Sequence, residues 1–234
     1  MTKPTIETAS VMILAGYYGD GSRTAEVWEH FDEKFKTQPF IRAHEDGCEV
    51  RFYNNEEPGK DIFVGFALAE GADAGEFDTL TLPAAWYAVF DVFVAQGYDS
   101  GNADMDKWLA DNAHEYGALE LDGKGFIVEC YTERFKDGNQ PDSIVEMWVP
   151  LYRVCQSCAM PMTKGEDYGT KADGTPSADY CHYCMTSGAF GNPGETLEEM
   201  IESCIPFCRA HYADDDAARA DMQTRYPKLK RWAN

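Results

Sequence analysis

The sequence has 234 residues, 44% of them apolar and 13% aromatic, so it can bury a hydrophobic core as one large domain or as a medium domain with an appendage. Its formal net charge of −21 disfavours nucleic acid, whose phosphates are bound mainly through Lys and Arg, and mildly favours cationic ligands. The sequence has no apolar run of about 18 residues and no signal-peptide stretch at the N-terminus, so we expect a cytoplasmic protein that does not associate with membranes.

The first predicted elements form a strand–helix–strand–strand unit. The apolar run 9–15 predicts a strand, and residues 16–21 predict a turn. Ser22 is then expected to cap a helix, in which apolar residues recur at helical spacing: Val27, Trp28, Phe31 and Phe35. Two further strands are predicted around residues 48–54 and 61–68.

The same order of elements returns in the second part of the chain. Residues 86–93 predict a strand, a helical stripe begins at Met105 and contains Trp108, and residues 125–135 and 143–151 predict the closing strands. Trp28 and Trp108 hold the same place in their helices. The repetition predicts an α+β fold made of a duplicated β-α-β-β unit, in which an antiparallel sheet has helices on one face.

Aromatic residues are frequent on the predicted strands. We expect most of them to belong to the core and a subset to line a pocket. They are Tyr53, Phe66, Tyr87, Phe90, Tyr131 and Trp148.

Cysteine spacing marks a second region. The composition changes near position 152, which predicts one domain over residues 1–152 and another over residues 153–234. Two Cys-x-x-Cys pairs, Cys155 with Cys158 and Cys181 with Cys184, predict two turns that hold one tetrahedral Zn²⁺ in a closed, structural site. The metal is expected to be needed for folding, because a segment of this size has little apolar core of its own.

Other interpretations of these cysteines are weaker. A redox Cys-x-x-Cys motif needs a βαβ setting that is absent here, and paired turns fit zinc better than an iron–sulfur cluster. His182 could replace a thiolate, but its place between Cys181 and Cys184 favours a surface position. Cys204 and Cys208 share one face of a predicted helix and are interpreted as buried apolar residues or free thiols.

The surroundings of the cysteines are acidic. Between positions 155 and 212 three basic residues stand against eight acidic ones, which disfavours nucleic-acid binding by this region. A role as a platform for a protein partner stays open.

Several motifs of the second region resemble the bacterial zinc-ribbon family over about residues 154–210. They are Cys155-Gln-Ser-Cys-Ala-Met-Pro-Met162, Asp167-Tyr-Gly-Thr, Asp179-Tyr-Cys-His-Tyr-Cys184, Gly188-Ala-Phe190 and Thr196-Leu-Glu-Glu-Met-Ile201. The resemblance implies a zinc site and little else.

Residues 1–152 resemble the GyrI-like effector-binding domain, a duplicated SHS2-type fold. The resemblance rests on Leu82-Pro-Ala-Ala-Trp-Tyr-Ala-Val-Phe90, the helix around Trp108 and Ser143-Ile-Val-Glu-Met-Trp-Val-Pro150. It implies an aromatic groove for amphipathic, often cationic small molecules, with a carboxylate on the last strand that matches Glu146. Trp148 lies on the same side of that strand, so the expected ligand-binding residues are Glu146, Trp148, Tyr53, Tyr87, Tyr131 and Phe66.

Two functions follow from this resemblance. The first is the binding of a cationic or aromatic small molecule for sensing or sequestration, since no DNA-reading helix-turn-helix is apparent. The alternative is a hydrolase that acts on reactive, electrophilic, cyclopropane-type compounds with Glu146 as the general base.

Overall fold

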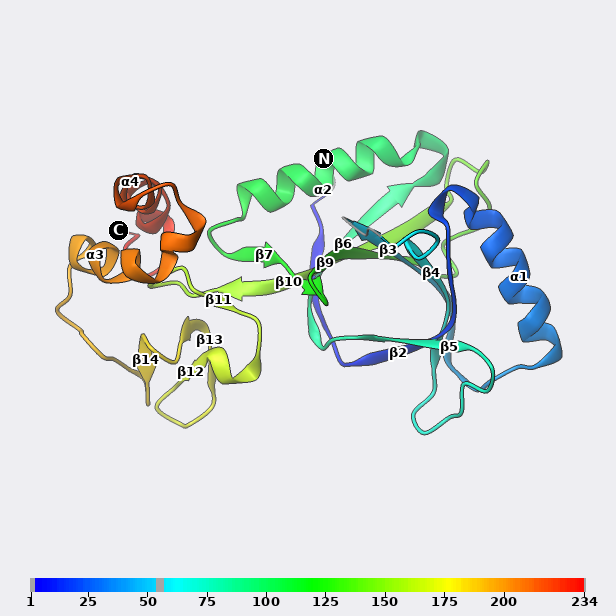
Figure 1. Ribbon diagram of the computed structural model, residues 1–234, viewed down its shortest axis with the longest axis horizontal. Coiled ribbons are helices and arrows are strands. Elements are labelled where there is room, and N and C mark those ends of the chain that lie inside the picture. The colour runs from blue at the N-terminus through cyan, green and yellow to red at the C-terminus, as the bar shows by residue number, and fades with distance from the viewer. Residues whose placement is uncertain (1–2, 54–56, 234) are drawn as a thin grey trace. The chain divides into compact units, whose positions relative to one another are not determined.

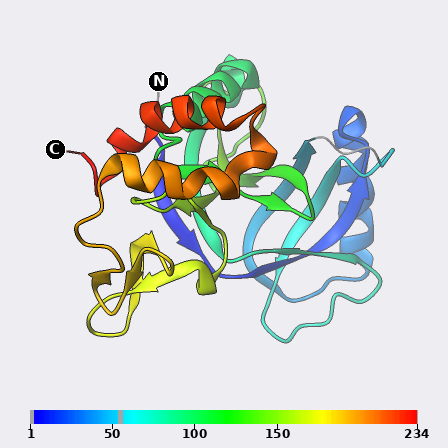
Figure 2. The ribbon, with the colours of Figure 1, turned by 60° about the vertical axis from the view of Figure 1, so that its left-hand side comes forward.

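The computed structural model describes residues 3–53 and 57–233, and these form two compact units (Figures 1 and 2). The first unit contains the chain up to Trp108 together with Ala118–Leu151. The second contains Leu109–Gly117 and the chain from Tyr152 onward. The short segment Leu109–Gly117 therefore packs with the cysteine-rich region, although it precedes that region by some distance along the chain.

The first unit is built on one curled antiparallel sheet (Figure 1). Its strand order is β1-β6-β10-β9-β3-β4-β2-β5, and the short strand β8 adds to β9. The strands are β1 (Thr5–Ala9), β2 (Met12–Gly19), β3 (Arg42–Tyr53), β4 (Ile62–Leu68), β5 (Asp78–Leu82), β6 (Ala85–Phe93), β8 (Glu120–Leu121), β9 (Lys124–Tyr131) and β10 (Ile144–Val154).

Two helices complete the predicted repeat. Helix α1 (Thr24–Thr37) lies between β2 and β3, and α2 (Tyr98–Asp111) lies between β6 and β9. The order β2-α1-β3-β4 is thus followed by β6-α2-β9-β10, which confirms the predicted α+β class. Strands β3 and β9 pair at the centre of the sheet and join the two repeats.

Both helices pack against the same face of the sheet. A row of paired residues crosses the sheet from Val64 through Glu49, Glu129 and Met147 to Phe90. Residues paired in this way point to one side. At one end of the row Val64 packs with the apolar residues of α1, and at the other end the Phe90 ring meets Trp108 of α2 at 6.0 Å.

The opposite face of the sheet carries its own apolar core. It includes Leu14, Val50, Phe63, Leu82 and Val128. The sheet closes part of this face by its own curvature, because β2 and β5 bring Leu14, Leu80 and Leu82 into the same cluster as residues of β3 and β9.

Some local expectations differ from the structure. Strand β2 continues through Gly19, and a short 3₁₀ helix η1 (Gly21–Arg23) precedes α1. Ser22 therefore does not cap α1: the Asp20 side chain accepts a hydrogen bond from the Ser22 backbone N–H instead. Strand β9 ends at Tyr131, well short of position 135, and the end of the predicted strand 48–54, Asn54, lies outside the described residues.

The second unit combines small sheets with two helices. Its short strands are β11 (Pro161–Met162), β12 (Tyr168–Thr170), β13 (Pro176–Cys181), β14 (Met185–Thr186) and β15 (Ala189–Phe190), and β7 (Tyr116–Ala118) spans the boundary between the units. Its helices are α3 (Leu197–Cys208) and α4 (Asp215–Arg225), with the 3₁₀ helices η3 (Gly165–Asp167), η4 (Arg209–His211) and η5 (Tyr226–Lys228). The 3₁₀ helix η2 (Val94–Gln96) belongs to the first unit.

Helix α3 begins at a capping box. The Thr196 hydroxyl accepts from the Glu199 backbone N–H at 3.2 Å, and the Glu199 carboxylate accepts from the Thr196 backbone N–H at 2.8 Å. Pro206 lies inside the last turn, two residues before the helix ends. Among the described residues, no helix combines the length and the apolar character needed to cross a bilayer.

Candidate functional site

Four cysteine side chains meet in the second unit. Cys155 and Cys158 lie in the turn that follows β10, Cys181 is the last residue of β13, and Cys184 follows it before β14. The four sulfur atoms lie within 4.8 Å of one another. Two separate turns therefore converge on one point, as the doubled spacing predicts.

The distances fit a tetrahedral metal site. With metal–sulfur bonds of about 2.3 Å, sulfur atoms at the corners of a tetrahedron lie about 3.8 Å apart. The Sγ atoms of Cys158 and Cys181 are separated by 3.6 Å. The Cys181 backbone N–H donates to Cys155 Sγ at 3.3 Å, a bond that stabilises a thiolate, and hydrogen bonds from Cys158 and the other cysteines lower the pKa of the Cys155 thiol.

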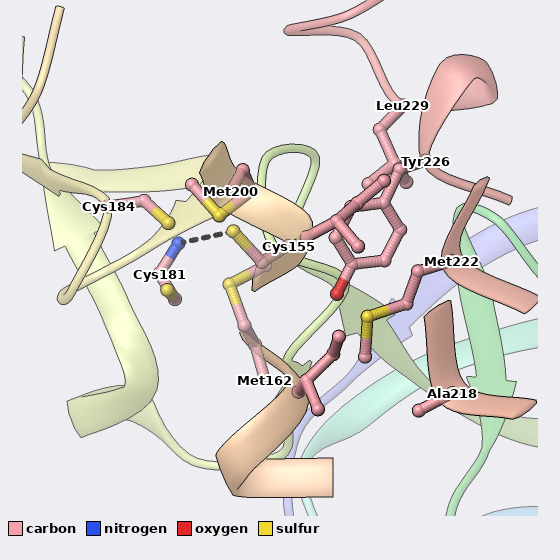
Figure 3. Close-up of a cluster of buried hydrophobic side chains, with 11 residues drawn as sticks. Cys155, Met162, Cys181, Cys184, Met200, Ala218, Met222, Tyr226 and Leu229 are labelled. Carbon is pink, nitrogen blue, oxygen red and sulfur yellow. Dashed lines mark hydrogen bonds between the residues drawn. The ribbon is translucent and has the colours of Figure 1, made fainter. Parts of the chain in front are cut away.

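An apolar cluster surrounds the cysteines (Figure 3). The sequence predicts little apolar core here, but α3 and α4 supply one, with Met200, Met222 and Tyr226 among its buried residues. The Tyr226 hydroxyl donates to the Cys158 carbonyl at 2.8 Å and so ties this core to the first cysteine turn.

His182, Cys204 and Cys208 lie near the four cysteines in the sequence. His182 is exposed and its ring lies against Tyr183, away from the four sulfur atoms. Cys204 and Cys208 are half-buried beside the cluster, with Cys204 Sγ 3.6 Å from the Met200 sulfur. Both cysteines lie outside the group of four.

The second unit is similar to a known protein family. Residues 154–233 match the family described as "Putative zinc ribbon domain". This segment is a zinc ribbon. The match extends the zinc ribbon well beyond the cysteine turns to include α3, α4 and η5, the elements that build its apolar core.

In the first unit, three of the expected ligand-binding residues line one cavity. Glu146 and Trp148 of β10 and Tyr87 of β6 surround a space of about 150 Å³ on the helix-free face of the sheet. The Tyr87 and Trp148 rings lie 5.6 Å apart. Burial raises the pKa of Tyr87 to about 12, and its hydroxyl donates to the Pro83 carbonyl.

Glu146 already has partners within the protein. Arg134 Nη1 donates to its Oε1 at 3.2 Å, and Trp148 Nε1 donates to its Oε2 at 3.1 Å. Arg134 also donates to Asp91 at 2.8 Å. Both carboxylate oxygens of Glu146 are therefore engaged, and Glu146 shares the Arg134 guanidinium with Asp91.

The other three expected residues lie on the helix-covered face. The Phe66 ring packs between Phe31 and Phe35 of α1, at 5.2 and 5.1 Å, in the core beneath that helix. Tyr53 at the end of β3 is 46% exposed, and Tyr131 at the end of β9 lies beside Trp28, with ring centres 5.8 Å apart. The predicted set is therefore divided between two faces of the sheet.

Two buried carboxylates on the helix-covered face were not predicted from the sequence. Glu49 of β3 and Glu129 of β9 are directly paired across the central strands, and both are buried. Arg51 Nε donates to Glu129 Oε1 at 2.6 Å, and Arg51 Nη2 forms an ion pair with Glu49 Oε1 at 2.5 Å. One guanidinium thus faces two carboxylates.

Aromatic donors complete this group. Trp28 Nε1 donates to Glu49 Oε2 at 2.9 Å, and the Tyr131 hydroxyl lies 2.9 Å from Glu129 Oε2 and 3.4 Å from Glu49 Oε2. Tyr98, the first residue of α2, lies close enough that the buried Glu129 affects its titration. We call Glu49, Glu129, Arg51, Trp28 and Tyr131 the acidic centre.

Burial is the main cause of the raised pKa values of the carboxyl and phenol groups at and beside the acidic centre. Burial raises the pKa of Glu49, and the Glu129 carboxylate beside it raises it further. Burial followed by Glu129 raises the pKa of Tyr98 to about 12, and the same two causes raise the pKa of Tyr131. Negative charge at this position is therefore under-compensated by the protein.

The sequence contained one signal for the acidic centre. Glu49 and Glu129 each stand between two apolar residues at the same place in the two repeats, with the same interval between them as between Trp28 and Trp108. A charged residue that alternates with apolar ones is ordinarily interpreted as solvent-facing, which explains why the pattern was missed.

Solved structures similar to this chain share little sequence with it. They include SAV2435 bound to tetraphenylphosphonium (13% identity, 64% of this chain and 94% of that chain, TM-score 0.46). The EcmrR C-terminal domain is 14% identical, with 65% of this chain and 98% of that chain covered and a TM-score of 0.48. A hydrolase from Listeria innocua is 9% identical, with 64% of this chain and 91% of that chain covered and a TM-score of 0.37. No curated protein matches the sequence.

Proposed function

We propose that residues 1–152 bind an amphipathic, cationic small molecule on the helix-covered face of the sheet, with its charge against the acidic centre. The observation that carries this proposal is the charge count: Glu49 and Glu129 share the single guanidinium of Arg51. A buried carboxylate without a full counter-charge is costly, and it is relieved either by protonation or by a bound cation.

The aromatic side chains around the acidic centre define the class of ligand. Trp28, Tyr98 and Tyr131 place rings next to the carboxylates, and Tyr53 offers a half-exposed ring beyond them. Ring faces attract cations and stack on the apolar parts of a ligand. A hydrophobic cation that carries its charge among aromatic rings satisfies both features.

Binding to this unit would serve sensing or sequestration in the cytoplasm. The zinc ribbon would then be a structural partner module and a candidate surface for another protein. The strongly acidic sequence supports a cationic ligand over nucleic acid.

The test uses a hydrophobic cationic dye and the quenching of tryptophan fluorescence. Glu49→Gln and Glu129→Gln should each weaken binding of the dye at least about tenfold, because each removes one carboxylate that faces the cation. Binding of an uncharged dye of similar shape should change little. Wild-type affinity for the cation in both variants would overturn the proposal.

Glu146→Gln is the matched control on the opposite face. The resemblance made Glu146 the expected carboxylate, but it lines the cavity on the face of the sheet opposite the acidic centre. We expect Glu146→Gln to leave dye binding within about twofold of wild type. A loss confined to Glu146→Gln would instead place the ligand in the cavity that Glu146, Trp148 and Tyr87 line.

A hydrolase is the second candidate function, and it is favoured by the position of the buried Glu49 carboxyl beside the Tyr131 hydroxyl, where burial raises the pKa of Glu49. A carboxyl group whose pKa lies closer to neutrality can exchange protons with water or a leaving group, and the Tyr131 hydroxyl beside it could polarise an electrophile. Turnover of an electrophilic cyclopropane compound should then be lost in Glu49→Gln. Equal turnover in that variant would exclude this carboxyl as the acid or base.

For the zinc ribbon we propose that Cys155, Cys158, Cys181 and Cys184 hold one Zn²⁺. The donor set is four sulfur atoms, the spacing matches tetrahedral coordination, and three of the four cysteines are buried. A closed shell of four thiolates leaves no position for a reacting water, so the ion would be structural. Metal analysis of the purified protein tests this proposal.

A further inference from the structure

Cys48 and Cys130 form a second pair of thiols that neither the zinc ribbon nor the acidic centre uses. They are partners across β3 and β9, one position away from Glu49 and Glu129 and therefore on the other face of the sheet. Opposite residues of antiparallel strands have Cβ atoms about 4.5–5.5 Å apart. Both cysteines are buried and unbridged.

These two thiols open onto the same cavity. Cys48 and Cys130 both line the space of about 150 Å³, together with the thioether side chain of Met12. The exposed area of the cavity wall is mainly apolar, with Leu82, Val128 and Trp148 among its residues, although His44, Asp46 and Glu146 also line it. The cavity therefore presents soft sulfur donors in a largely apolar setting.

The two thiols are neighbours, because Cys48 and Cys130 are directly opposite each other on β3 and β9. Hydrogen bonding to Cys48, with burial as the next cause, raises the pKa of the Cys130 thiol. The two buried thiols therefore face one cavity from opposite positions on neighbouring strands, where a single ion can contact both.

We propose that Cys48 and Cys130 form a two-thiolate site for a soft, thiophilic cation that accepts linear coordination, of which mercury(II) is the best match. Thiolate and thioether donors select soft metal ions over hard ones. Two cysteines are too few for zinc, which takes four ligands in structural sites. The site lies on the opposite face from the acidic centre, so it does not depend on the proposed cation-binding function.

The chemistry balances without an oxidant or reductant. Two thiols and one mercury(II) ion give one uncharged bis-thiolate complex and release two protons to solvent. A neutral product suits the apolar cavity better than the anionic complex that a monovalent ion would give. Because protons are released, binding should strengthen as the pH rises.

The test compares zinc-loaded full-length protein with variants, in the presence of excess glutathione. The competing monothiol removes mercury(II) from single cysteines, so only sites that chelate it keep the ion. Wild type should retain about one more mercury(II) ion per chain than the double variant Cys48→Ser/Cys130→Ser. Each single variant, Cys48→Ser or Cys130→Ser, should also lose this ion completely. Cys204→Ser/Cys208→Ser is the matched control and should retain it. Mercury(II) that replaces zinc at the zinc ribbon is bound equally by all these variants, so it does not affect the difference between them.

Tryptophan fluorescence gives the second readout. Trp148 lines the cavity, so the extra mercury(II) should quench it in wild type and not in Trp148→Phe or Cys48→Ser. Equal retention by wild type and Cys48→Ser/Cys130→Ser would overturn the proposal. So would single variants that each keep the ion, since that outcome shows two independent thiols and no shared site.

Discussion

Glu49 on β3 and Glu129 on β9 lie directly opposite each other where the two repeats of the sheet join. Each is flanked along the same row by an apolar neighbour, Val64 on one side and Met147 on the other. Two carboxylates thus occupy the centre of an otherwise apolar row beneath the helices. This arrangement disfavours folding unless the charges are compensated, which makes it a functional candidate.

Arg51 should be essential for the stability of the acidic centre. Arg51→Leu removes the only guanidinium that the described residues place between Glu49 and Glu129, and leaves two buried carboxylates unpaired. We expect the free energy of unfolding to fall by about 3 kcal/mol, measured by urea denaturation. The double variant Arg51→Leu/Glu129→Gln should recover part of this loss, and no recovery would show that Arg51 acts through packing alone.

The stability of the protein should depend on the ionisation of Glu49. Its folded-state pKa is raised above the ordinary value of 4.5, so the folded state favours the protonated form. The resulting contribution to stability is complete below pH 4.5 and is lost as the pH rises through the folded-state pKa. Glu49→Gln should therefore gain stability relative to wild type as the pH increases in urea titrations. Parallel pH profiles for the two proteins would contradict this assignment.

Zinc content should depend on four cysteines and no others. We expect about one zinc per chain by metal analysis, lost in Cys181→Ser because three thiolates cannot close the tetrahedral shell. Cys204→Ser is the control, since Cys204 lies beside the cluster but outside the group of four. Loss of zinc from Cys204→Ser would show that the ligand set is wrong.

The hydroxyl of Tyr226 should stabilise the zinc ribbon. Tyr226→Phe keeps the buried ring but removes the donor to the Cys158 carbonyl. We expect a loss of about 1 kcal/mol in the unfolding free energy, with zinc retained. A variant that is as stable as wild type would mean that water replaces the hydroxyl at this carbonyl.

Phe66 should contribute to packing more than to ligand binding. Its ring contacts Phe31 and Phe35 beneath α1, so Phe66→Ala should lower the unfolding free energy by about 2–3 kcal/mol. Dye affinity, corrected for the folded fraction, should remain close to that of wild type. A selective loss of affinity in a fully folded variant would return Phe66 to the ligand site.

Local features of the chain were predictable to different degrees. The doubled Cys-x-x-Cys spacing predicted the converging turns, because each turn presents its two thiols through local geometry. The order of the two repeats followed from the short-range pattern of apolar residues. The prediction that Ser22 caps a helix was wrong, because Asp20, two residues earlier, caps the 3₁₀ helix that precedes α1.

Sequence alone determined three features of this protein: four cysteines at the spacing of metal ligands, a repeated β-α-β-β pattern and a strongly acidic chain. Only the tertiary structure decided which charged residues became buried together. Glu49 and Glu129 are far apart in the chain, and their pairing depends on the register of β3 against β9. Because side chains alternate between faces, that register places the carboxylates under the helices and the thiols of Cys48 and Cys130 on the other side. No local pattern specifies such a register, since it is fixed by burial over the whole sheet.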